Sequence, residues 1–164
     1  FIPNWSMWMI LELEEYLKRS GDRAMIDAFR PRVTALLGFY AKYLNSDGLL
    51  EKLPAWVFVE WSEANKFVQN VNYPSNMTWA EVLDCMNRLY GMPELAAEAE
   101  KVRETVRRQS WTGQWFCDNA VRRSDGSLVH GDLPVLRVHV RHRHSRTVSD
   151  AVEETSRGFR TQTP

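Results

Sequence analysis

Apolar residues recur at intervals of three and four along four stretches of this sequence, with glycine or proline between the stretches. This spacing places the apolar side chains on one face of an α-helix. Gly21 and Gly91 follow two of the stretches, where a left-handed residue commonly ends a helix, and Pro93 opens the last one. The predicted helices cover residues 7–20, 23–45, 76–90 and 93–109. The sequence therefore predicts an all-α chain of two αα-hairpins plus loops, as in a helical toroid or solenoid.

Local chemistry predicts several features of the second and third helices. Asp22 is expected to cap the second helix, and Ser75 or Asn76 the third, because their side chains accept hydrogen bonds from free backbone amides. Pro31 is expected to kink the second helix, because a proline inside a helix removes one backbone hydrogen bond.

The first helix carries aromatic residues at its N-terminal end. Asn4 or Ser6 is expected as its N-cap. Trp5 has two open interpretations, a core residue or part of a ligand pocket, and the core interpretation is favoured. The predicted buried stripe consists of Trp5, Trp8, Met9, Leu13, Tyr16 and Leu17.

Composition limits the classes of protein to which the chain can belong. Its 164 residues suit one domain or a piece of one, and its net charge of +0 argues against a nucleic-acid partner. No apolar run is long enough to span a membrane, and no signal-peptide pattern is visible. Cys85 and Cys117 lack metal-ligand spacing and favour a reducing compartment. Because no signal segment is visible, we expect a cytoplasmic location. We expect no metal and no cofactor. Because the chain opens without methionine, we expect an N-terminal truncation.

A long connection over residues 49–74 gathers aromatic, acidic and amide side chains. Aromatic faces pack on the apolar faces of sugar rings, while carboxylates and amides bind sugar hydroxyls. One interpretation is therefore a carbohydrate pocket. The other is that the aromatic residues fill the gap between the hairpins and that the polar groups cap helix ends. Composition alone does not decide between the two interpretations. The residues concerned include Trp56, Glu60, Trp61, Asn65 and Asn72.

An ordered set of short segments resembles the barrel domain of the α-L-rhamnosidases, glycoside hydrolase family 78. The resemblance covers roughly residues 1–129. It implies an (α/α)6 barrel, of which the two hairpins would form an arc. The segments are Ile2 to Ser6, Ser20 to Asp22, Asp47 to Leu50, Trp56 to Asn65, Asn72 to Asn76, Arg88 to Gly91 and Asp118 to Arg122.

The resemblance also implies a reaction, the hydrolysis of terminal α-L-rhamnosyl bonds with inversion. One carboxylic acid protonates the leaving oxygen, and a carboxylate across the ring activates water. The family motifs that carry these groups are absent from this chain, so we expect no catalytic residue here and no activity of the chain alone. The segment Glu60-Trp61 resembles a Gly-Asp-Trp loop of the family, although Val59-Glu60 replaces Gly-Asp. The predicted substrate-binding residues are Glu60, Trp61, Trp56, Asn65 and Asn72.

Two alternatives to this function stay open at this point. One is another glycosidase with the same (α/α)6 toroid, and the other is a non-enzymatic helical-repeat scaffold that binds a protein partner. A scaffold would expose its aromatic residues on a concave helix face, whereas here they cluster in one loop.

Residues 130–164 differ sharply in composition from the rest. They contain all four histidines, many arginines and a single aromatic residue, Phe159. A metal or nucleic-acid site is one interpretation. A shifted reading frame is favoured, because allowed codons for residues 130–143, read one nucleotide later, encode T-E-T-C-Q-Y-Y-A-F-M-F-G-I-A, which resembles the next helix of the rhamnosidases. We therefore divide the chain into a partial barrel domain, 1–129, and an out-of-frame, poorly ordered tail, 130–164.

Overall fold

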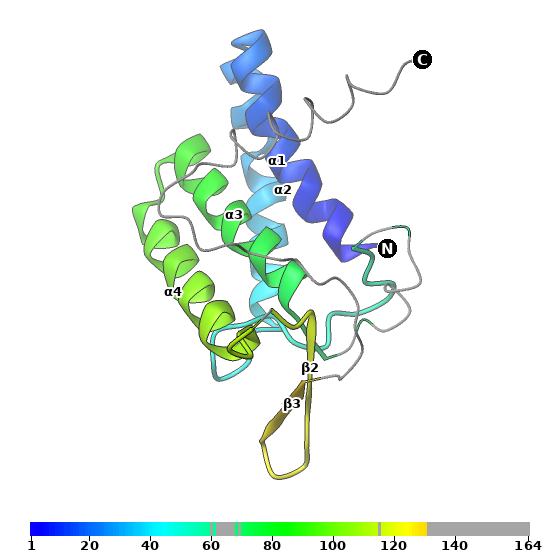
Figure 1. Cartoon of the computed structure of the whole chain (residues 1–164). Coiled ribbons are helices and arrows are strands. Elements are labelled where there is room, and N and C mark those ends of the chain that lie inside the picture. Colours follow the sequence, from blue (N-terminus) through cyan, green and yellow to red (C-terminus); the bar gives the residue numbers. More distant parts are fainter. Residues whose placement is uncertain (60, 62–67, 69, 115, 131–164) are drawn as a thin grey trace, which may run out of the picture.

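Four helices make up most of the described part of the chain. The computed structural model describes residues 1–59, 61, 68, 70–114 and 116–130. The helices are α1 (Pro3–Ser20), α2 (Arg23–Ala41), α3 (Tyr73–Tyr90) and α4 (Pro93–Ser110). Consecutive helices run in opposite directions and form two αα-hairpins, with α3 packed between α1 and α4 (Figure 1). This arrangement confirms the predicted all-α hairpins.

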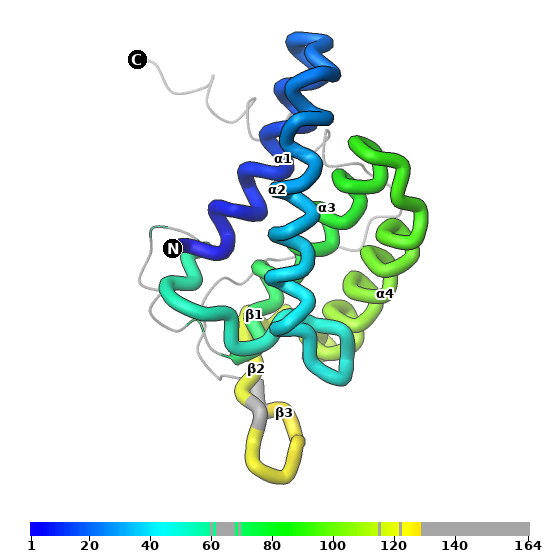
Figure 2. The backbone as a smooth tube through the Cα atoms, turned by 180° about the vertical axis from the view of Figure 1, so that it is seen from behind, coloured from blue at the N-terminus to red at the C-terminus, as the bar shows by residue number. Residues whose placement is uncertain are grey.

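A small antiparallel sheet lies at one end of the helices. Its strands are β1 (Val71–Asn72), β2 (Asn119–Arg122) and β3 (Leu128–His130), in the order β1-β2-β3. The β2-β3 hairpin projects away from the helices (Figure 2). Val71 pairs with Ala120, so the sheet joins the connection before α3 to the segment after α4. Strand β1 was not predicted from the sequence.

Most of the predicted helix ends are correct. Gly21 and Gly91 have φ angles of 69° and 66° and end α1 and α3 in the left-handed conformation that glycine adopts readily. Asp22 caps α2 by accepting a hydrogen bond from the Met25 amide at 3.0 Å. Helix α2 continues through Pro31 and ends at Ala41, four residues earlier than predicted.

The predicted cap of α3 is wrong. Asn72 occupies this position, and its Oδ1 accepts a hydrogen bond from the Ser75 amide at 2.9 Å. Ser75 and Asn76 lie inside the helix, which begins three residues earlier than expected. Pro74 permits this early start, because a proline in the first helical turn sacrifices no intrahelical hydrogen bond.

The predicted buried stripe of α1 is partly wrong. Leu13 is buried as expected, but Trp5 and Trp8 are 55% and 54% exposed. The core side of α1 is centred instead on Met7 and Ile10, both fully buried. Helix α1 carries apolar residues on two faces, and packing against α3 and α2 buries the aliphatic one. The N-cap of α1 is Ile2, which makes no side-chain cap bond, so the predicted capping by Asn4 or Ser6 is also wrong.

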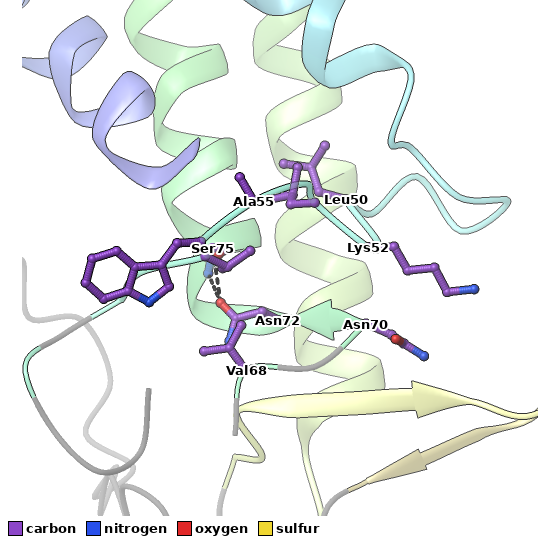
Figure 3. A pocket seen from close by; sticks show the side chains of 10 residues that line it. Leu50, Lys52, Ala55, Val68, Asn70, Asn72 and Ser75 are labelled. Carbon is purple, nitrogen blue, oxygen red and sulfur yellow. Dashed lines mark hydrogen bonds between the residues drawn. The ribbon is translucent and has the colours of Figure 1, made fainter. Parts of the chain in front are cut away.

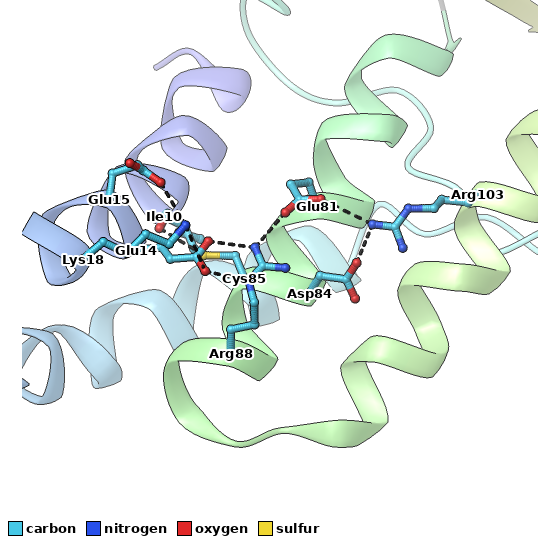
Figure 4. A network of polar contacts seen from close by, with 9 residues as sticks. All are labelled: Ile10, Glu14, Glu15, Lys18, Glu81, Asp84, Cys85, Arg88 and Arg103. Atoms are coloured by element: carbon cyan, nitrogen blue, oxygen red, sulfur yellow. Dashed lines mark hydrogen bonds and ion pairs between the residues drawn. The ribbon is translucent and has the colours of Figure 1, made fainter. Parts of the chain in front are cut away.

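A network of ion pairs crosses the faces of α1, α3 and α4 (Figure 4). Arg88 of α3 binds both carboxylate oxygens of Glu14 in α1, at 2.6 and 2.7 Å, and also contacts Glu81 at 2.7 Å. Arg103 of α4 bonds to Asp84 and reaches Glu81 at 3.4 Å. The bidentate geometry of Arg88 fixes the position of α1 relative to α3.

The residues expected to form the out-of-frame tail lie outside the described residues, apart from His130, whose backbone pairs with Ala120. No helix in the described ranges is both long enough and apolar enough to cross a lipid bilayer.

Candidate functional site

Four aromatic side chains from α1 and the α2–α3 connection gather at one end of the hairpins. We call Trp5, Trp56, Phe58 and Trp61 the aromatic cluster. Phe58 lies at its centre, 8% exposed, with ring centroids 4.8 Å from Trp61, 5.1 Å from Trp56 and 6.2 Å from Trp5. Its three tryptophans are exposed: Trp56 to 49%, Trp5 to 55% and Trp61 to 82%. The cluster therefore presents indole rings to solvent around a buried phenyl ring.

A cavity of about 350 Å³ adjoins this cluster, and we call it the loop cavity (Figure 3). Its volume lies at the lower end of the range of small-molecule sites, about 300–1,000 Å³. The described polar groups of its wall are amides, a hydroxyl and one ammonium group. The lining residues are Leu50, Lys52, Leu53, Ala55, Trp56, Val57, Val68, Asn70, Asn72 and Ser75.

The backbone around the loop cavity departs from ordinary geometry at two positions. Lys52 and Ala55 adopt φ angles of 54° and 61°, in the left-handed region that side chains with a Cβ rarely occupy. The Lys52 amide donates to the Asn70 carbonyl at 2.7 Å, which joins the two ends of the connection. These two turns were not predicted, because glycine is the residue that normally marks them.

Asn4 holds the aromatic cluster against the helices. It is 3% exposed, and its Nδ2 donates to the Ser75 hydroxyl at 2.8 Å. Its Oδ1 accepts a hydrogen bond from the Phe58 amide at 3.2 Å. One buried side chain of α1 thus positions both the centre of the cluster and the first turn of α3. Asn4 was predicted only as a possible helix cap, because the partners that give it this role lie 54 and 71 residues away in the sequence.

Asn72 lies in the wall of the loop cavity and is 5% exposed. Its Oδ1 accepts hydrogen bonds from the amide and the hydroxyl of Ser75, and its Nδ2 donates to Asn119 at 2.8 Å. These bonds join β1, β2 and the N-terminus of α3. Asn72 therefore shapes the cavity while it is itself held in place by the fold.

The structure brings together three of the five predicted binding residues. Trp56 and Trp61 lie 6.1 Å apart between ring centroids, and Trp56 shares the lining of the loop cavity with Asn72. Glu60 and Asn65 lie outside the described residues. Asn70 also lines the cavity, although it is not among the predicted binding residues.

Ion pairing shifts the pKa of Glu14, and burial shifts the pKa of Cys85. The Arg88 guanidinium holds the pKa of Glu14 below its usual range, so this carboxyl stays ionised and pairs α1 with α3. Burial raises the pKa of Cys85 to about 12, so its thiol stays protonated at neutral pH. Across the described ranges, no three His, Cys, Asp or Glu side chains form a group that could hold a metal ion.

Comparison with known proteins gives a match of fold. No protein-family model matches the chain. No curated protein matches it either. Among solved structures, a rhamnosidase of glycoside hydrolase family 78 from Bacillus sp. GL1 matches with a TM-score of 0.64 and 24% sequence identity over 78% of this chain. The matched region is 14% of that protein's chain. The predicted resemblance is thereby confirmed as a resemblance of fold: four helices packed as hairpins match a small part of a family 78 protein.

Proposed function

We propose that this chain is part of the catalytic domain of an inverting glycoside hydrolase that removes terminal α-L-rhamnose from glycosides or polysaccharides. Within that enzyme, the residues of this chain would bind the sugar. The observation that carries this proposal is the placement of exposed indole rings beside a cavity with amide and hydroxyl groups in its wall. The fold match to a rhamnosidase adds independent support.

The chemistry of rhamnose suits such a site. A 6-deoxy sugar carries a methyl group and C–H faces that pack on aromatic rings, while its hydroxyls need hydrogen-bond partners. Trp56 and Trp61 would supply the aromatic surface, and Asn70 an amide in the cavity wall. Asn72 keeps the wall in shape through its bonds to Ser75 and Asn119. Glu60 and Asn65 remain proposed contacts.

Hydrolysis with inversion requires two carboxyl groups about 6.5–9.5 Å apart on opposite faces of the sugar. The described lining of the loop cavity offers amide, hydroxyl, ammonium and aromatic groups for binding. We therefore propose that the general acid and base belong to other parts of the complete enzyme. On this proposal the purified chain binds rhamnose and does not hydrolyse an aryl α-L-rhamnoside. Protein-dependent release of the aryl group would contradict it.

The proposal is tested by titrating the chain with L-rhamnose and, for comparison, D-glucose in a calorimeter. We expect rhamnose to bind in preference to glucose, and Trp61→Ala to weaken rhamnose binding at least tenfold. Trp111→Ala is the matched control, because Trp111 is also exposed, at 40%, but packs on Phe116 beyond the end of α4. Absence of rhamnose binding, or equal weakening by both variants, would overturn the proposal. A preference for glucose would favour another glycosidase of the same toroid.

A further inference from the structure

Residues 52–57, which we call the strap, form one side of the loop cavity. Most of them line it. Figure 3 shows Lys52 and Ala55 on this side of the cavity and Asn72 on the other. The strap includes Trp56, so the position of the strap decides where this indole ring meets a bound sugar.

The chain is held at both ends of the strap. At its start, the Lys52 amide donates a hydrogen bond to the Asn70 carbonyl at 2.7 Å. Directly after it, the Phe58 amide donates to Asn4 Oδ1 at 3.2 Å. Because these bonds fix the two ends, the strap can change its position only through rotation about backbone angles between them.

Two residues of the strap have a strained backbone. Lys52 and Ala55 have φ angles of 54° and 61°, and they are the only described residues other than glycine with a positive φ. A residue with a Cβ is disfavoured in this region, and such positions gather at ligand clamps and switches. Between them, the ring of Pro54 fixes its own φ at about −65° and restricts Leu53 to extended conformations. Lys52 and Ala55 therefore lie on either side of a stiff pair of residues, where hinges would be expected.

We infer that the strap alternates between the observed position, which closes on the sugar, and an open position that admits it, with Lys52 and Ala55 as its hinges. This inference rests on the proposed function. The strain at the hinges opposes closure, because a hinge that leaves the left-handed region is relieved of it. Contacts between the sugar and Trp56 offset this cost, so the ligand shifts the population toward the closed position.

The affinity of hinge variants for L-rhamnose, measured by calorimetry on the full chain, tests the inference. Ala55→Gly removes the strain, because glycine adopts the left-handed conformation readily. We expect this variant to bind L-rhamnose about threefold tighter than the unmodified chain, since a larger fraction of the free protein is already closed. Ala55→Val should weaken binding about threefold, because a β-branched residue is disfavoured even more at a positive φ.

Gly91→Ala is the matched control. Gly91 ends α3 with a φ of 66°, whereas Asn72 caps the other end of this helix beside the cavity. Nothing lies within 4 Å of a Cβ added at Gly91, so alanine there introduces the same backbone strain and no steric clash. We expect this variant to have a lower Tm and an unchanged affinity for L-rhamnose.

Failure of this inference is distinguishable from failure of the proposed function. If both Ala55 variants bind L-rhamnose as the unmodified chain does and only their Tm changes, the strap is static and the inference is overturned. If no chain binds L-rhamnose, the proposed function fails, and NMR relaxation dispersion at the Trp56 indole decides whether the strap moves. Exchange that Ala55→Gly suppresses would support the motion, and equal exchange in both chains would overturn it.

Discussion

Replacing Asn76 by alanine should destabilise the fold more than any other single change to an amide side chain of α3. Asn76 is fully buried, and its side-chain amide hydrogen-bonds to both the backbone amide and the backbone carbonyl of Leu50. Its Oδ1 accepts from the Leu50 amide at 2.7 Å, and its Nδ2 donates to the Leu50 carbonyl at 3.0 Å. It also donates to the Asn72 carbonyl at 2.9 Å. These bonds attach the α2–α3 connection to the first turn of α3.

The size of this destabilisation follows from the Leu50 amide and carbonyl, which lose their hydrogen-bond partners. Leu50 is 1% exposed, so water does not readily replace the lost bonds. Each buried backbone group without a partner costs about 1–3 kcal/mol, which gives about 2–6 kcal/mol for the Leu50 amide and carbonyl together. Alanine returns about 0.5 kcal/mol through its higher helix propensity. We expect a net loss of about 3–4 kcal/mol, a large part of the roughly 5–15 kcal/mol that stabilises a typical domain.

Urea unfolding followed by circular dichroism measures this loss. Asn87→Ala is the matched control, because Asn87 lies on the same helix, is only partly buried and gains the same helix propensity. We expect this control to change the free energy of unfolding by less than about 0.5 kcal/mol, as is usual for surface substitutions. A loss below about 1 kcal/mol for Asn76→Ala would refute the reasoning, since the Leu50 backbone would then have found other partners.

Three further predictions concern the site, the ion pairs and the tail. Asn4→Ala should weaken rhamnose binding at least fivefold in a calorimetric titration, because it releases Phe58, while Asn87→Ala should leave binding unchanged. The pKa of Glu14 is lower in the folded than in the unfolded chain, so its stabilisation is present above the ordinary glutamate pKa, about 4.3, and is lost as the pH falls through the folded value. The melting temperature should therefore fall less steeply between pH 5 and 3 in Arg88→Met than in the unmodified chain, and identical slopes would contradict this. We propose that residues 130–164 are out of frame. Truncation after Val129 should then leave the melting temperature unchanged, and a chain with the proposed frame restored should melt at a higher temperature, because the corrected segment would supply an aromatic helix. Strong destabilisation by the truncation would show that residues 130–164 contribute to the fold.

The sequence predicts the features of this fold that depend on local chemistry. The helix ends at Gly21, Asp22 and Gly91 are correct, because each depends on the conformational freedom or hydrogen bonding of one residue and its neighbours. The exposure of Trp5 and Trp8 was not predicted. Helix α1 carries two apolar faces, and only tertiary packing selects which of them is buried.

The candidate site was predicted as a set of residue types and not as a geometry. Trp56 and Trp61 were identified because aromatic residues cluster in one connection, and the structure places them side by side. The bonds of Asn4 to Phe58 and Ser75 were not predictable, because they join residues far apart in the sequence. The pairing of β1 with β2 joins Val71 to Ala120 and was missed for the same reason.

The loop cavity is the place where we propose that the sugar binds. Crystals of the chain soaked in L-rhamnose test it most directly. We predict electron density for a pyranose ring in the loop cavity, with its apolar face against Trp56 or Trp61 and its hydroxyls toward Asn70. An empty cavity at a saturating rhamnose concentration, or a sugar bound only at another surface, would contradict the claim.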